Sequence, residues 1–283
     1  MTVAVDYKRQ IYAVRDLPTL PVIAQRILGL VDDEKTGTDQ LARIIASDQT
    51  LAVKVLSMGN SAYYGRRAQI GTVKQAIVLI GGNMLKQIAL SVLVFKALDR
   101  GSKGRKEFWR HSLLAANAAS LIAREAGGMA SDICFMAGLL HDVGKLVLAS
   151  SLPVEYAAIL ERTGGDGLDL VDAEREAIET DHAEVGAWMA ERWQLPAALV
   201  HAIRFHHNAA LAELPHAGVI AAVQAANVCA AAADLAAKET GVDPEFIAVP
   251  EGAMAQLRMT APQFYELVIE LVRRSGEIDQ FLE

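Results

Sequence analysis

The chain is predicted to be all-α, a bundle of helices. Hydrophobic residues make up 52% of its 283 residues but aromatic residues only 6%, so most of the apolar content is Ala, Leu, Val and Ile. Ala and Leu are strong helix formers. No segment shows the clean alternation of apolar and polar residues that a half-buried strand requires, although residues 246–249 could form a short extended piece. The length suits one large domain or two small ones.

Residues 1–100 are predicted to form an N-terminal helical subdomain. Pro18 and Pro21 keep its entry extended, because proline disfavours helical backbone at the preceding residue. Three residues of types that commonly cap helices, Thr38, Asp48 and Thr72, stand before helical patterns. Helices are therefore expected at 22–31, 39–46, from 49 to about 58, 73–80 and from there to about 98.

Residues 101–240 are predicted to form a second helical subdomain, and residues 241–283 a C-terminal helical extension. The polar segment 99–106 contains two glycines and is the best candidate for a linker. Pro153 suits the first position of a helix, and Asp181 with Glu184 resembles a capping box. The expected helices are 108–126, 132–150, 154–162, 170–180, one from 182, one from 196 to 207, 215–233 and 260–282.

A histidine and an aspartate stand side by side near the end of the apolar helix predicted at 132–150. They are His141 and Asp142, in the stretch Gly138-Leu139-Leu140-His141-Asp142-Val143-Gly144-Lys145. Neighbours on a helix point about 100° apart, but both could reach one metal, since imidazole and carboxylate are metal ligands. Lys145 lies four residues after His141 and should return to the same face. Such a face suits a metal and a phosphate.

Further histidines lie in helical segments of the second half of the chain. Taken singly, each could be a core or surface histidine whose nitrogens are hydrogen-bonded. As a set beside the His–Asp pair they indicate a shared polar pocket. They are His111, His182, His201, His206 and His207.

The charge is distributed unevenly. The formal net charge of −7 argues against wrapping nucleic acid with the whole surface. Residues 54–110, however, carry +9, and the remainder carries −16. This basic segment is either a docking face for an acidic partner or for phosphate groups, or a set of solvated helix faces that acidic neighbours neutralise.

Cysteine usage and the N-terminus favour a cytoplasmic protein. Cys134 and Cys229 each stand alone in an apolar helical context, which is neither a disulfide framework nor a zinc-finger spacing. The first eight residues do not have the pattern of a signal peptide. The apolar run 215–233 is interrupted by Gln224 and Asn227, which indicates a buried helix rather than a membrane span.

Other catalytic motifs are missing from the sequence. Ser57 and Ser112 do not stand in the Gly-x-Ser-x-Gly elbow of a serine hydrolase. The sequence contains neither a phosphate-binding loop with Gly-Lys-Ser/Thr nor a dinucleotide fingerprint after a strand. The remaining candidate chemistry is that of a metal site.

The histidines and their order resemble a known family. The series His111, His141-Asp142, His182 and His206-His207 is similar to the ligand order of HD-domain phosphohydrolases and their HD-GYP relatives. Over about residues 15–210 the chain more closely resembles the HD-related output domain, HDOD. The motifs that carry this resemblance are Leu17-Pro18-Thr19-Leu20-Pro21, Asp48-Gln49, Asn60-Ser61, Ala76-Ile77-x-Leu79-Ile80-Gly81, Phe108-Trp109-Arg110-His111-Ser112, Gly138 to Lys145, His182-Ala183-Glu184-Val185-Gly186, Trp193-Gln194-Leu195-Pro196 and Ile203-Arg204-x-His206-His207.

The resemblance implies an all-helical fold of the HD-domain-like type and a bacterial signalling or regulatory role, usually without demonstrated catalysis. Two departures bear on activity. The phosphohydrolase pattern ends with an aspartate ligand in an Ala-Asp context, whereas this chain has Ala226-Asn227, and an amide is a poorer ligand than a carboxylate. The Gly-Tyr-Pro signature after the paired histidines is also missing. Glu107, four residues before His111, is either an additional carboxylate ligand or an exposed acid at a helix start.

Two hypotheses follow from these residues. The first is a non-catalytic signalling module that acts through protein partners, with a degenerate site that could still bind metal. The second is a metal-dependent phosphohydrolase, with Lys145 on a phosphate oxygen beside His141 and Asp142 and with metal-bound water as nucleophile. The implied ligands of a divalent iron, manganese or zinc ion are His111, His141, Asp142, His182, His206 and His207. A nucleotide or other phosphate-containing ligand is a further possible partner, and helix 260–282 could pair with a second copy of itself.

Overall fold

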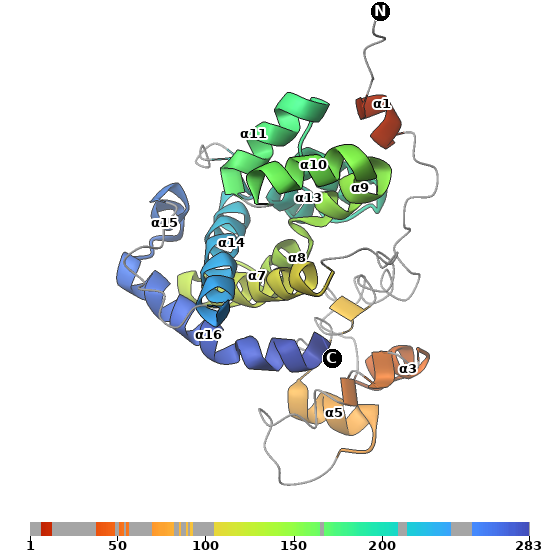
Figure 1. Cartoon of the computed structure of the whole chain (residues 1–283). Helices are drawn as coiled ribbons and strands as arrows, with labels where there is room; N and C mark the ends of the chain where they lie inside the picture. The colour runs from red at the N-terminus through yellow and green to blue at the C-terminus, as the bar shows by residue number, and fades with distance from the viewer. Residues whose placement is uncertain are drawn as a thin grey trace, which may run out of the picture.

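The computed structural model contains only helices and irregular backbone in the part of the chain that it describes (Figure 1). This part comprises residues 7–12, 38–48, 51–53, 55–56, 70–81, 85, 89, 91–92, 105–164, 167–208, 214–238 and 251–282. The predicted all-α fold is confirmed.

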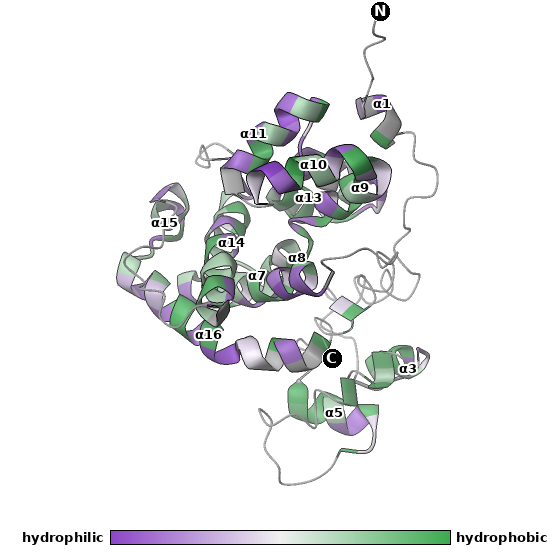
Figure 2. Ribbon diagram, in the orientation of Figure 1, coloured by the Kyte–Doolittle hydropathy of each residue, from purple (hydrophilic) through white to green (hydrophobic). Residues whose placement is uncertain are grey.

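The helices follow one another in the chain with short connections in the second half. They are α1 (Tyr7–Tyr12), α3 (Thr38–Ala46), α5 (Val73–Ile80), α7 (Arg105–Ala126), α8 (Ser131–Leu140), α9 (Val143–Ser151), α10 (Pro153–Thr163), α11 (Gly167–Ile178), α12 (His182–Arg192), α13 (Ala197–Phe205), α14 (Ala217–Lys238), α15 (Glu251–Leu257) and α16 (Ala261–Leu282). Hydrophilic and hydrophobic bands alternate along α11 and α16 in Figure 2, as expected of helices with one face on a core.

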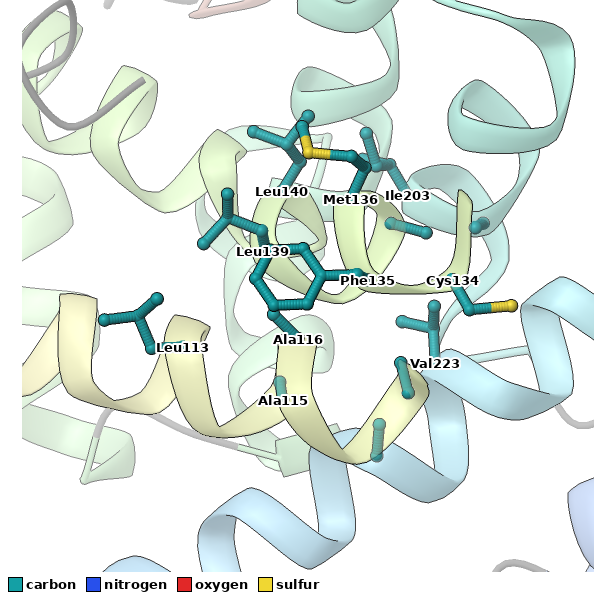
Figure 3. Close-up of a cluster of buried hydrophobic side chains, with 14 of the residues drawn as sticks. Leu113, Ala115, Ala116, Cys134, Phe135, Met136, Leu139, Leu140, Ile203 and Val223 are labelled. Carbon is teal, nitrogen blue, oxygen red and sulfur yellow. The ribbon is translucent and has the colours of Figure 1, made fainter. Parts of the chain in front are cut away.

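The core is centred on α8, which packs against α7, α13 and α14. Every residue of α8 from Cys134 to Leu140 is buried. Figure 3 shows Phe135 and Leu139 of α8 beside Ala115 and Ala116 of α7. The close approach needs a glycine, since a Cβ on Gly138 would lie 2.7 Å from the carbonyl oxygen of Ala115. The alanine-rich sequence thus allows the helix backbones to come close together.

A second close approach joins α9 and α12. A Cβ on Gly144 would lie 1.9 Å from the carbonyl oxygen of His182 and 2.8 Å from the backbone nitrogen of Gly186. Both glycines are buried within their helices. This contact places the start of α9, and with it Asp142, directly against the first turn of α12.

The predicted single helix 132–150 is wrong at the position that matters most. The structure divides it into α8 and α9, with a turn at His141 and Asp142. Asp142 has φ −96° and ψ 8°, away from helical values. The two side chains therefore do not diverge by the helical angle. Lys145 pairs with Asp142, three residues earlier, and Nε2 of His141 lies 3.4 Å from the same carboxylate oxygen.

Most predicted helix starts in the described residues are confirmed. The Asp48 carboxylate accepts a hydrogen bond from the backbone of Leu51, and Thr72 with Gln75 forms a capping box. Pro153 opens α10, and the Asp181 carboxylate caps α12. The helix expected from 49 to about 58 is helical at the residues described there, 51–53 and 55–56, and residues 105–106 of the predicted linker already belong to α7. The predictions for 17–31, the helix to residue 98, the rest of the linker and the extended piece 246–249 fall wholly or largely outside the described residues.

The C-terminal helix belongs to the same core as the histidine-bearing helices. α16 packs on both α7 and α14, and its residues Phe264, Val268 and Leu271 are buried. Figure 1 shows α16 running below α14 and α7. The proposed boundaries at residues 100 and 240 stay a prediction.

Two segments are long and apolar enough to cross a membrane by length and composition alone. They are Ser131–Ser151 and Ala217–Ala236. Within these windows 72% and 61% of the residues are buried inside the fold. Both segments serve as core helices of the bundle, as in a soluble protein.

Candidate metal centre

Five histidines from four parts of the fold converge on the carboxylate of Asp142. His111 lies on α7, His141 and Asp142 lie at the turn between α8 and α9, and His182 opens α12. The last two, His206 and His207, follow the end of α13. Their ligand atoms form two groups, each within 4.8 Å, that share Asp142: one with His182, His206 and His207, and one with His111 and His141.

The two oxygens of Asp142 face different histidines. Oδ1 lies 3.4 Å from Nε2 of His182 and 3.6 Å from Nε2 of His206. Oδ2 lies 3.4 Å from Nε2 of His141 and 3.9 Å from Nε2 of His111. Because each oxygen serves its own group of nitrogens, the carboxylate is placed to be shared between two neighbouring ion positions.

Backbone carbonyls set the orientation of two histidines. Nδ1 of His141 lies 2.8 Å from the carbonyl oxygen of Gly138, and Nδ1 of His206 lies 2.7 Å from that of Ile203. A carbonyl oxygen only accepts, so each Nδ1 carries the proton and each Nε2 presents a lone pair. Both Nε2 atoms, and Oδ1 of Asp142, are buried without a hydrogen-bond partner. Buried polar atoms of this kind are rarely left unpaired, and these three fit a metal.

A buried glutamate orients His182, and the sequence analysis missed it. Oε2 of Glu174, on α11, lies 2.7 Å from Nδ1 of His182 and accepts from its backbone nitrogen at 2.9 Å. The hydroxyl of Tyr156 donates to Oε1 at 2.8 Å. A carboxylate behind a histidine is the usual outer support of a metal ligand. The sequence does indicate that Glu174 lies on the buried face of its helix, because it stands midway between the buried Leu170 and Ile178 at helical spacing.

Burial keeps three of the histidines in the form that binds metal. It lowers the pKa of His141 and of His206 to about 4, against a partial opposing effect of Asp142. Burial and the neighbouring His206 and His182 lower the pKa of His207 as well. Burial alone would raise the pKa of Asp142, but His141 and Lys145 outweigh it and hold the pKa well below its usual range. Neutral imidazoles around an ionised carboxylate are the protonation states that a cation requires.

These pKa shifts predict an acid-sensitive fold. The pKa of His141 and His206 is about 4 in the folded protein against 6.5 for an ordinary histidine, so the unfolded chain binds more protons between those values. The stability of metal-free protein should therefore be complete above about pH 6.5 and fall as the pH drops towards 4, by on the order of 3 kcal/mol per histidine. Urea midpoints measured between pH 7 and 4.5 test this. A doubly substituted His141→Gln/His206→Gln protein should show a shallower dependence, and equally steep curves would contradict the expectation.

Four other residues singled out in the sequence have different outcomes. Nζ of Lys145 lies 2.8 Å from Oδ2 of Asp142, so the lysine stands at the centre. Asn227 also stands there, with Oδ1 2.9 Å from Nε2 of His111. Glu107 is exposed at the start of α7 and is in neither group of ligand atoms, which favours the exposed-acid interpretation. His201 lies away from the centre and stacks near His216 instead.

A cavity of about 620 Å³ reaches the centre at His207. Nε2 of that histidine lies 3.0 Å from Nε2 of His182. The wall also contains Phe205 and two arginines, Arg175 and Arg204. Arg175 pairs with Asp181, and Nη2 of Arg204 pairs with Glu191 at 2.7 Å. A volume of this size is typical of small-molecule pockets.

A helical bundle whose buried centre combines an adjacent His–Asp pair with further histidines defines a protein of the HD type. The family model described as HDOD domain matches residues 17–209. The chain therefore belongs to the HDOD family, as the motifs listed above led us to expect.

Similar proteins share this fold. A solved HDOD domain protein of Geobacter sulfurreducens has a TM-score of 0.79 at 23% identity, over 96% of each chain. A protein of Shewanella amazonensis SB2B, named provisionally as a phosphohydrolase, has a TM-score of 0.76 at 22% identity, over 99% of this chain and 98% of that one. A Treponema pallidum (strain Nichols) protein of unassigned function is 28% identical over 206 residues. The match covers 71% of this chain but only 39% of that relative.

Proposed function

We propose that this chain is a bacterial, cytoplasmic regulatory protein that acts through signalling partners and keeps a metal centre without phosphohydrolase turnover. The observation that carries the proposal is the pairing of a buried, metal-suited centre with a neutral amide, Asn227, at the last ligand position of the phosphohydrolase pattern. Because Asn227 stands where the phosphohydrolase pattern has an aspartate, Asp142 is the one carboxylate in the two groups of ligand atoms. Fewer anions weaken the binding of a second cation, and without that cation the centre loses the second Lewis acid that two-metal hydrolysis requires.

The donor set favours a transition metal over magnesium or calcium. Imidazole nitrogens suit iron, zinc and manganese sites, whereas magnesium and calcium prefer oxygen. His182, His206 and His207 would hold one ion with Oδ1 of Asp142, and His111 and His141 would hold a second with Oδ2. A bound ion would supply Lewis acidity and a fixed positive charge.

The buried free cysteines Cys134 and Cys229 fit a reducing compartment, which supports the proposed cytoplasmic location.

A metal-dependent phosphohydrolase is the second candidate. The cavity beside His207 favours it, because a phosphate-containing ligand such as a nucleotide could approach the centre there, beside the partly exposed side chains of Arg175 and Arg204. Lys145 is half-buried next to Asp142, where it could hold a phosphate oxygen. The provisional name of the Shewanella relative points in the same direction.

A homodimer through residues 260–282 remains a further proposal, for which Ile269, exposed on α16, could provide an apolar contact.

Turnover measurements separate the two candidates. Protein loaded with manganese, iron or zinc is assayed on p-nitrophenyl phosphate and bis(p-nitrophenyl) phosphate, beside Asp142→Ala and Glu176→Ala. Glu176 is an exposed acid that pairs with Arg162 and lies outside the centre. We expect wild-type rates equal to those of Asp142→Ala. Turnover that survives in Glu176→Ala but is lost in Asp142→Ala would establish the hydrolase instead.

A further inference from the structure

A chain of charged contacts joins the C-terminal helix to the metal centre. Arg110, next to His111 on α7, forms ion pairs through Nη1 with Asp234 of α14 and through Nε with Asp279 of α16, the latter at 2.8 Å. The other oxygen of Asp234 lies 3.5 Å from Nδ1 of His111. One side chain of α14 therefore connects Arg110 to the ring of a candidate ligand.

The neighbours of the two ring nitrogens of His111 favour different positions for the single ring proton. Oδ1 of Asn227 lies 2.9 Å from Nε2 and accepts a hydrogen bond when that nitrogen carries the ring proton. A carboxylate near Nδ1 favours the proton there instead, which frees the lone pair of Nε2 for a metal. Only the second arrangement makes His111 a ligand through Nε2, the nitrogen that faces Oδ2 of Asp142. The carboxylate of Asp234 is thus placed to decide whether His111 can bind metal.

The local charge supports this role for Asp234. Arg110 is one cation between two carboxylates, so the group retains a net negative charge beside His111. The side chains of Arg110 and Asp234 are only 14% and 22% exposed, so water screens the interaction less than at the surface. On α12 the same arrangement recurs, with Glu174 behind His182.

We propose that Asp234 is a positioning residue that selects the Nδ1–H form of His111, and that Asp279 of the C-terminal helix holds it in place through Arg110. This rests on the proposed function, in which the centre binds metal. Asp234 compensates in part for the missing carboxylate at Asn227: it lies two helical turns further along α14 and acts on the histidine from behind. A partner that displaces α16 would then weaken metal binding at the His111 half of the centre.

Zinc affinity and the protonation form of His111 test the proposal together. Asp234→Asn, Asp279→Asn and the control Glu270→Gln are compared with wild type by zinc competition against a chromogenic chelator. Glu270 pairs with Arg274 within α16, away from the centre. We expect Asp234→Asn to weaken the His111-dependent zinc by about 10–100-fold, the range for outer carboxylates of metal sites. Asp279→Asn should weaken it less, and Glu270→Gln should leave it unchanged.

The nitrogen spectrum of His111 in metal-free protein is the second readout, because a purely structural role would not change it. The proton should reside on Nδ1 in wild type and move to Nε2 in Asp234→Asn, with helical content and thermal midpoint checked in each variant. Zinc binding with unchanged affinity in a folded Asp234→Asn protein overturns the inference, as does an Nε2–H form in wild type. If wild type binds no zinc, the proposed function fails, and the spectrum alone decides the role of Asp234.

Discussion

Replacing Asp142 with alanine is expected to empty the metal centre. Asp142 contributes an oxygen to each of the two groups of ligand atoms, so its loss removes a ligand from both ion positions. Outer carboxylates of metal sites already account for about 10–100-fold in affinity, and loss of this inner ligand should exceed about 100-fold. Elemental analysis of protein purified without chelator, followed by metal titration, measures the effect.

The same substitution should destabilise the metal-free protein. Nζ of Lys145 lies 2.8 Å from Oδ2 of Asp142, and the lysine side chain is 13% exposed. Removing one partner of a buried ion pair costs about 3–5 kcal/mol, because the other charge stays uncompensated. Urea unfolding in the presence of chelator isolates this contribution. Glu176→Ala serves as the matched carboxylate control, since its side chain is 74% exposed. Full metal content in Asp142→Ala would sink the assignment of this centre.

Replacing Gly144 with alanine is expected to disturb the centre without touching any ligand. The new Cβ would lie 1.9 Å from a backbone oxygen of His182, and a backbone atom has no alternative rotamer through which to escape. Helices α9 and α12 must separate, at a cost of about 3 kcal/mol or more. A loss of this size lowers the thermal midpoint by roughly 6–12 °C in a domain of this length.

The separation should also weaken metal binding, because Asp142 precedes α9 and His182 opens α12. Gly276→Ala is the matched control: it lies within α16, and a Cβ there meets nothing within 4 Å. Alanine in that open helical position should be neutral or slightly stabilising. Calorimetry and zinc competition on both variants test the expectation. A Gly144→Ala protein with wild-type midpoint and affinity would show that the helices tolerate the added methyl group.

Much of the fold could be read from local sequence. The caps at Thr72 and Asp181 and the proline at the start of α10 were predictable, because capping depends on a few consecutive residues. The apolar run through α8 and α9 indicated burial correctly but not the turn inside it. The break occurs where His141 and Asp142 face the centre, and hydrophobic periodicity carries no signal for that.

The candidate ligands were predictable for a similar reason. The histidines, their order and the adjacent His–Asp pair can be read directly from the sequence, without knowledge of the fold. The residues behind the ligands were less visible. Glu174, Asp234 and Asp279 act from other helices, at 8, 123 and 168 residues from the histidines they support, and a single charged residue on a helix normally indicates a solvated face.

The sequence by itself determined the helical class, many of the helix starts in the described residues and the set of side chains able to bind metal, since these depend on residue type and short spacing. The tertiary structure alone decided which of them meet: it brought five histidines around Asp142, left Glu107 and His201 outside, and placed carboxylates behind His182 and His111. The physical reason is helix packing. The approaches at Gly138 and Gly144, set by steric fit between distant segments, fix the positions of the side chains around the centre.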